Sequence, residues 1–249
     1  MTAQERFEVP VASEPLALAV GDVHVWRCRL QQPEDRRQTL VQALSPEERQ
    51  RGDKFHFEHH RRQWTIARGF LRAVLGRYLG IPAEEIRFRY HHLGKPALAD
   101  EQNPCNWQFN LSHSADGALL AIGRDTPLGV DLEQLRPMEN MLALARRYFA
   151  AEEARQLEQV APAQQILAFF NCWTRKEAIL KACGKGLSLP LDRFLVSFRP
   201  GEPARVVELA GQPGEAKRWS LTALQPWPDF VACLARQETT PNLVCLAFD

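Results

Sequence analysis

Two carboxylates separated by a single apolar residue are the side chains of this sequence best suited to chemistry. Asp131 and Glu133 lie in the segment Leu-Gly-Val-Asp-Leu-Glu at residues 128–133. If this segment is a strand leaving the core, its period of two sends both carboxylates to the same face. Like charges so placed repel each other, and a hard divalent cation bound by both relieves that repulsion. The pattern predicts a cation site, against the simpler alternative of a solvated strand end.

A third carboxylate, Glu177, belongs to a segment with strong helical periodicity at residues 166–183. On a helical wheel it lies inside the apolar arc, which is formed by Ile166, Phe169, Phe170, Trp173 and Leu180. Burial of an unpaired charge is unfavourable, so Glu177 needs a partner. The pattern leaves two partners open: Lys181, four residues further on, or a metal ion shared with Asp131.

Basic and hydroxyl side chains at three further places suit recognition of an anion. Arg61, Arg68 and Arg72 share one stripe of a helix predicted over residues 61–79, where they form either a phosphate cradle or a solvated basic edge. Lys95 lies in a Gly-Lys-Pro turn, and the polar run Ser-His-Ser at 112–114 follows a strand-like segment. The sequence contains no P-loop, GxGxxG motif or nucleophile elbow. Phosphate recognition would therefore depend on these separate groups.

The order of helical and strand-like segments predicts an α+β protein of two similar α/β halves. Each of the two periodic helices is followed by a short strand, at 85–90 and at 194–198. Further helices are predicted at 45–57, 140–148 and 151–159, the first with Ser45 as N-cap and Pro46 behind it. Further strands are predicted at 23–30, 108–112, 118–122, 128–132, 206–209, 219–224 and 230–235. We expect the halves to be residues 1–118 and 119–249.

Composition and charge exclude several classes of function. The 249 residues are 45% hydrophobic and 24% charged, with a net charge of +1, so there is no bulk attraction to nucleic acid or an anionic membrane. The first fifteen residues lack the apolar core of a signal peptide, and no apolar run approaches the ~20 residues of a membrane span. The six cysteines show no metal-ligand spacing, which favours idle thiols in a reducing compartment. We therefore expect a cytoplasmic protein.

Four separated blocks, taken in order, resemble the signature of the surfactin-synthetase-activating type of 4′-phosphopantetheinyl transferase. They read Gly-Lys-Pro-Ala-Leu at 94–98, Phe-Asn-Leu-Ser-His-Ser at 109–114, Gly-Val-Asp-Leu-Glu at 129–133 and Trp-Thr-Arg-Lys-Glu-Ala at 173–178, the last continuing to residue 191. The resemblance implies a pseudo-twofold monomer of two α/β halves. Each half has a helix packed on a small, mostly antiparallel sheet, and coenzyme A binds between them.

The resemblance also implies roles for individual residues. The magnesium ligands it implies are Asp131, Glu133 and Glu177. The residues implied to contact coenzyme A are Lys95, Ser112, His113 and, at its diphosphate, Lys181. Basic residues near the 3′-phosphate of coenzyme A are matched by Arg51 and, less closely, by Arg72. The candidate catalytic residues are therefore Glu177, Lys181 and Glu133.

The implied reaction transfers phosphopantetheine from coenzyme A to a serine of an apo-acyl or peptidyl carrier protein, releases 3′,5′-ADP and depends on magnesium. Such carriers belong to fatty acid, polyketide or nonribosomal peptide synthases, and Lys185 with a leucine among residues 187, 189 and 191 is predicted to contact them. The base that takes the serine proton is either Glu177 or a water activated near Glu133. Two alternatives are a metal-dependent nucleotide phosphohydrolase and a non-catalytic coenzyme A-binding module. A pure binder has no use for Glu177 on an apolar face.

Overall fold

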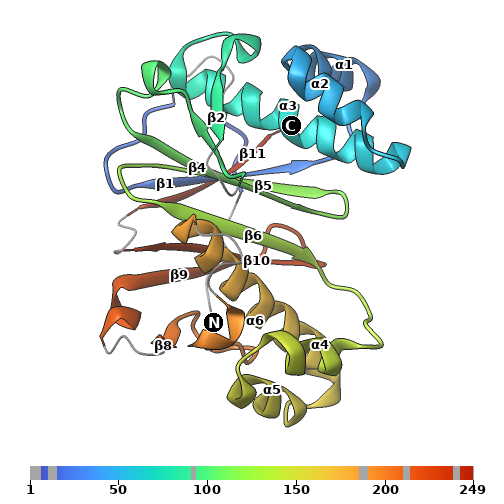
Figure 1. The fold of residues 1–249 in the computed structure, drawn as a ribbon, viewed down its shortest axis with the longest axis vertical. Coiled ribbons are helices and arrows are strands. Elements are labelled where there is room, and N and C mark those ends of the chain that lie inside the picture. The colour runs from blue at the N-terminus through green and yellow to red at the C-terminus, as the bar shows by residue number, and fades with distance from the viewer. Residues whose placement is uncertain are drawn as a thin grey trace.

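The computed structural model describes residues 7–10, 16–90, 94–184, 190–209, 214–237 and 242–248 of this chain. These residues form four layers: two β-sheets face each other, and each sheet carries a long helix on its outer side (Figure 1). Helix α3 (Glu58–Leu79) lies on one outer side and helix α6 (Pro162–Cys183) on the other. The long helix on a small sheet thus occurs twice.

The first sheet has the strand order β11-β1-β5-β4. Its strands are β1 (Val23–Arg29), β4 (Trp107–Ser114), β5 (Gly117–Arg124) and β11 (Leu243–Ala247). Strand β11 runs parallel to β1, whereas the other neighbours are antiparallel. Helices α1 (Glu34–Gln42) and α2 (Pro46–Asp53) lie beside α3, and β2 (Phe88–Tyr90) pairs with β3 (Pro96–Leu98) at the same end of the molecule.

The second sheet is antiparallel, with the strand order β6-β10-β9. Its strands are β6 (Leu128–Gln134), β9 (Trp219–Leu224) and β10 (Phe230–Gln237). Helices α4 (Met141–Tyr148) and α5 (Ala151–Glu158) lie beside α6, and β7 (Phe194–Val196) pairs with β8 (Val206–Leu209). Short 3₁₀ turns occur at Ala83–Glu85, Asp100–Gln102, Leu191–Arg193 and Glu215–Arg218.

Residues at the helix ends explain where these helices begin and end. Ser45 caps α2: its hydroxyl accepts from the backbone N–H of Glu48, whose carboxylate accepts from the N–H of Ser45. Helix α6 begins with Pro162, which has no N–H to leave unsatisfied. Helices α3 and α6 both end at a glycine with positive φ, 67° at Gly80 and 63° at Gly184.

Three apolar cores lie between the four layers. Phe70 and Val74 of α3 pack on the first sheet, and Phe169 and Ile179 of α6 pack with residues of the second. The third core, with residues such as Val130 of β6, lies between the two sheets. Strands β5 and β10 are covered on both faces, which explains their nearly continuous burial.

The α+β architecture with a helix on a mostly antiparallel sheet in each half is confirmed. All five predicted helices form, and the N-cap role of Ser45 is correct. Helix α1 and strands β3 and β11 were not predicted. The strand predicted over residues 85–90 is shorter: residue 85 ends a 3₁₀ turn, and strand β2 begins only at Phe88. The expected boundary after residue 118 falls inside β5, and β11 joins the first sheet. The division into 1–118 and 119–249 stays a prediction.

Among the described residues, no helix combines the length and apolar character needed to cross a membrane. All six cysteines are free thiols, and four of them are buried.

Candidate active site

Strand β6 presents Asp131 and Glu133 at alternate positions, as the period of two predicts. The Asp131 side chain is almost completely buried, with 7% of its surface exposed, and Glu133 keeps 21%. The preceding Gly129 explains how β6 comes so close to α6. A Cβ atom there would lie 2.2 Å from the carbonyl oxygen of Ala178 and 2.4 Å from the backbone nitrogen of Ala182. The two backbones touch, and this contact brings α6 side chains to the carboxylates.

Asp131 is the centre of a compact polar cluster. Its Oδ1 accepts from Lys181 Nζ at 2.6 Å and from the hydroxyl of Ser112 at 3.0 Å. Lys181 Nζ also donates to Ser112 Oγ at 2.9 Å, so these three side chains from β6, α6 and β4 contact one another. The structure thus joins three residues that the sequence resemblance placed in one site. It also shows that Lys181 pairs with Asp131, rather than with Glu177 four residues earlier on its own helix.

The other oxygen of Asp131 is the feature that points to a cation. Oδ2 is the buried side-chain polar atom that has no hydrogen-bond partner among the described residues. An ionised oxygen buried without a partner is costly, and a divalent cation supplies the missing contact. The described residues do not hold three acidic, histidine or cysteine side chains gathered at ligating positions. Asp131, Glu133 and Glu177 carry hard oxygen donors, the ligand type that suits Mg²⁺.

Electrostatic effects show that Glu177 belongs to the same cluster. Its side chain is half-buried on α6. Burial raises the pKa of the Glu177 carboxyl, the charges of Asp131 and Glu133 raise it further, and Lys181 opposes them. Glu177, which the helical wheel placed in the apolar arc of its helix, thus faces the like charges of Asp131 and Glu133. A bound cation would relieve this repulsion.

Lys95 and His113 lie at the edge of the cluster. Lys95 Nζ donates to the carbonyl oxygens of Lys181 at 2.6 Å and Leu128 at 3.2 Å, so it connects the Gly-Lys-Pro turn to β6 and α6. Burial, together with the charge of Lys181, lowers the pKa of Lys95 to about 8, although Cys183 acts in the opposite direction. His113 is exposed, and its pKa is lowered by partial loss of water contact and by the charge of Lys181. Both side chains are therefore influenced by the positive charge of Lys181.

Arg72 does not lie on a solvated edge. It is buried, with 3% of its side chain exposed, and its Nε donates to Glu48 Oε2 at 2.5 Å. Arg68 donates to the other oxygen of Glu48, also at 2.5 Å, so one capping carboxylate holds two arginines of α3. The interpretation of this stripe as a solvated basic edge is wrong for Arg68 and Arg72, because both are buried and each forms an ion pair with one oxygen of Glu48 on α2. A cofactor contact by Arg72 stays a prediction.

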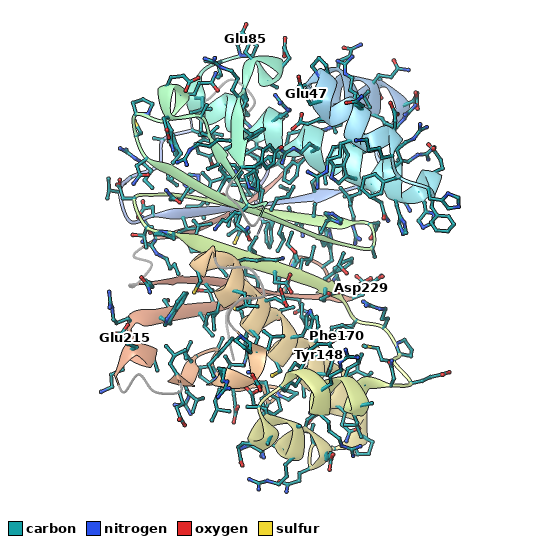
Figure 2. All side chains as sticks on the ribbon, in the orientation of Figure 1. Glu47, Glu85, Tyr148, Phe170, Glu215 and Asp229 are labelled. Atoms are coloured by element: carbon teal, nitrogen blue, oxygen red, sulfur yellow. The ribbon has the colours of Figure 1, made fainter. Side chains whose placement is uncertain are left out.

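Arg51 lines an open cavity of about 430 Å³ between α2 and the β2 strand. Arg87, Tyr90 and Glu47 also line it, and Glu47 is labelled in Figure 2. Arg51 is exposed, with its guanidinium 5.9 Å from the ring of Trp64. This cavity suits the basic contact that the resemblance implies for Arg51, whereas Arg72 forms part of its buried wall.

Three further side chains contact the site residues in ways that the sequence did not predict: Ser114 was expected only as a possible anion contact, and Asn110 and Arg136 were given no role. Ser114 donates to Glu133 Oε2 at 2.7 Å, Arg136 donates to the same oxygen at 3.2 Å, and Asn110 accepts from the backbone N–H of Val130 at 2.8 Å. Period-two alternation over residues 110–114 was a usable signal, because it puts Asn110, Ser112 and Ser114 on one face of β4.

The predicted carrier contacts at 185, 187 and 189 lie outside the described residues, and Leu191 is buried at 7% exposure.

Comparison with known proteins agrees with this fold and site. The family description "4′-phosphopantetheinyl transferase, N-terminal" matches residues 30–124, and "4′-phosphopantetheinyl transferase superfamily" matches residues 127–235. The chain belongs to the 4′-phosphopantetheinyl transferase family. It is accordingly an enzyme of the transferase class.

Individual relatives extend the match over most of the chain. The 4′-phosphopantetheinyl transferase HetI of Nostoc sp. is 40% identical over 220 residues, which are 88% of this chain and 90% of HetI. The transferase ffp of Bacillus subtilis is 30% identical over 84% of this chain and 90% of its own length. Sfp of Bacillus subtilis is 32% identical over 67% of this chain and 71% of its own length. The similarity to HetI and to ffp therefore extends over more than four fifths of this chain.

Proposed function

We propose that this chain transfers 4′-phosphopantetheine from coenzyme A to the serine hydroxyl of an apo-acyl or peptidyl carrier protein and releases 3′,5′-ADP, with Mg²⁺ as the cation. Family membership supports the transfer of phosphopantetheine. The observation that carries the magnesium-dependent chemistry is Asp131, whose Oδ1 is held by Ser112 and Lys181 while Oδ2 is buried without a partner.

In the proposed reaction the serine oxygen forms a bond to the β-phosphorus, and the bond from that phosphorus to the ADP oxygen breaks. When bound, Mg²⁺ would neutralise charge on the diphosphate and orient the displacement. Lys181 is placed beside Asp131 to stabilise negative charge that grows on the leaving phosphate. The serine proton passes either to Glu177 or to a water near Glu133, and these two routes stay open.

A cytoplasmic location and a monomeric state are part of the proposal. The free thiols, four of them buried, support a reducing compartment. The proposed partners are carrier proteins of fatty acid, polyketide or nonribosomal peptide synthases. Because the proposal does not distinguish among these three kinds, activity should be tested on a panel that contains all of them.

The direct test is intact-mass spectrometry of apo-carrier proteins incubated with this chain, coenzyme A and Mg²⁺. We expect at least one carrier to gain the mass of one phosphopantetheine group, and 3′,5′-ADP to appear in equal amount. Cleavage of coenzyme A without a gain of carrier mass would instead indicate a phosphohydrolase. Tight coenzyme A binding with neither product would indicate a binding module, and either result would refute the proposed transfer.

The pKa of Lys95, about 8, gives the proposal a pH signature. Because a phosphate ligand favours the charged lysine, coenzyme A affinity should be full below pH 8 and should fall, by about tenfold, as the pH rises towards 9 and beyond. Isothermal titration across pH 7–9.5 measures this change. Lys95→Arg keeps its charge throughout and serves as the control, with a flat profile. An identical fall in the arginine variant would remove Lys95 from the coenzyme A site.

A further inference from the structure

Strands β4 and β6 belong to different sheets, and side chains rather than backbone groups join them. On the edge of β6 away from β10, three alternate N–H groups donate to side chains of β4. Val130 N–H donates to Asn110 Oδ1 at 2.8 Å, Leu132 N–H to Ser112 Oγ at 3.3 Å, and Gln134 N–H to Ser114 Oγ at 3.3 Å. This side-chain ladder satisfies a strand edge that would otherwise leave buried donors unpaired.

Two rungs of the side-chain ladder continue into the carboxylates of the site. Ser112 accepts from the N–H of Leu132 and donates to Asp131 Oδ1 at 3.0 Å. Ser114 repeats this arrangement one step along: it accepts from the N–H of Gln134 and donates to Glu133 Oε2 at 2.7 Å. In each case the serine restrains one carboxylate oxygen. Among the described residues, the bonds to Glu133 both end on Oε2, as those to Asp131 both end on Oδ1.

The second contact of Glu133 is much weaker as a restraint. Arg136, from which Oε2 also accepts, is half exposed at 52%, and it follows β6 by only two residues. An exposed ion pair of this kind contributes little and does not hold one rotamer. Without the hydroxyl of Ser114, the three side-chain torsions of Glu133 would be free to follow Arg136 into solvent.

We propose that Ser114 is a positioning residue, which holds Glu133 on the cation side of the cluster as Ser112 holds Asp131. The inference rests on the proposed function, since it takes Glu133 as a ligand or a water-orienting group of the cation site. It assigns Ser114 no contact with substrate. By bonding Oε2, Ser114 would fix the orientation of the Glu133 carboxylate and leave Oε1 to contact the cation or a water.

The test compares Ser114→Ala with Ser114→Thr, which restores the hydroxyl and suits a strand. Mn²⁺ serves as the probe, titrated against the full chain with and without coenzyme A and followed by electron paramagnetic resonance. We expect Ser114→Ala to weaken Mn²⁺ binding about tenfold, as is usual when a residue that orients a metal ligand is lost. Ser114→Thr should stay within about twofold of the parent protein. The Mg²⁺ concentration for half-maximal transfer should rise by the same factor as the Mn²⁺ dissociation constant.

A matched control is Ser220→Ala, which removes a half-buried strand hydroxyl from β9 in the same sheet as β6. It should leave Mn²⁺ binding and thermal stability unchanged. Two results would overturn the inference: parental Mn²⁺ affinity in Ser114→Ala, or equal losses in the alanine and threonine variants that follow a fall in melting temperature. Failure of the parent protein to modify any carrier would refute the proposed function instead, and the Mn²⁺ titration would still report on Ser114.

Discussion

Replacement of Asp131 by asparagine should reduce the rate of carrier modification about a thousandfold, a loss comparable to removal of a preorganised transition-state contact. Asparagine preserves the shape and the acceptor for Ser112 and Lys181, but it removes the negative charge beside the unpartnered Oδ2. The change therefore tests charge rather than packing. Product formation by intact-mass spectrometry gives the rate, and circular dichroism verifies the fold. Asp35→Asn, an exposed change on α1, is the matched control and should be neutral.

Glu177→Gln supplies the complementary arm of the same experiment. We expect a similar loss of transfer, but with equal or greater stability of the ligand-free protein at neutral pH. The sign follows from the raised pKa of Glu177: the folded state holds its proton more tightly than the unfolded state, so the parent loses stability as the pH rises above about 4.5. The glutamine side chain does not ionise, so the variant lacks this loss of stability. A parental rate in either the Asp131 or the Glu177 variant would disprove the cation site.

The largest effect on stability should come from Lys176, which precedes Glu177 on α6 and is turned about 100° from it around the helix axis. Lys176 is fully buried and donates to Glu153 at 2.6 Å, to Leu191 O at 2.7 Å and to Phe194 O at 2.5 Å. Lys176→Met would leave the Glu153 charge unpaired in the core. We expect a loss of about 3–5 kcal/mol in the free energy of unfolding, measured by urea denaturation.

Two comparisons make the Lys176 result specific. Lys217→Met, an exposed change, should cost almost nothing. In the double variant Glu153→Gln/Lys176→Met the unpaired charge is gone, so much of the lost stability should return. The pH dependence has a definite sign: burial already raises the pKa of Glu153, and removal of Lys176 raises it further. The single variant should therefore lose stability as the pH rises from about 4.5 to 7. A loss below 1 kcal/mol would show that the pair is not a structural anchor.

Arg72 and Lys181 show where reasoning from the sequence stopped. For both residues, helical periodicity failed to identify the charged partner. The carboxylate that neutralises Arg72 is Glu48, on a different helix, and the one that binds Lys181 is Asp131, on a strand fifty residues away in sequence. A helical wheel reports only neighbours three or four residues apart, so it suggested Glu177 for Lys181. Tertiary packing gave Lys181 another neighbour.

The sequence by itself determined the carboxylate pair, the apolar-face position of Glu177 and the family, because these depend on local periodicity and on residue identity in separate blocks. Only the tertiary structure decided how β6 meets its neighbours. The absence of a side chain at Gly129 lets β6 touch α6, and the side-chain ladder from β4 joins the two sheets at the same strand. Strand β11 was missed for the same reason: its pairing with β1 brings together residues from the two ends of the chain, which no local pattern reports.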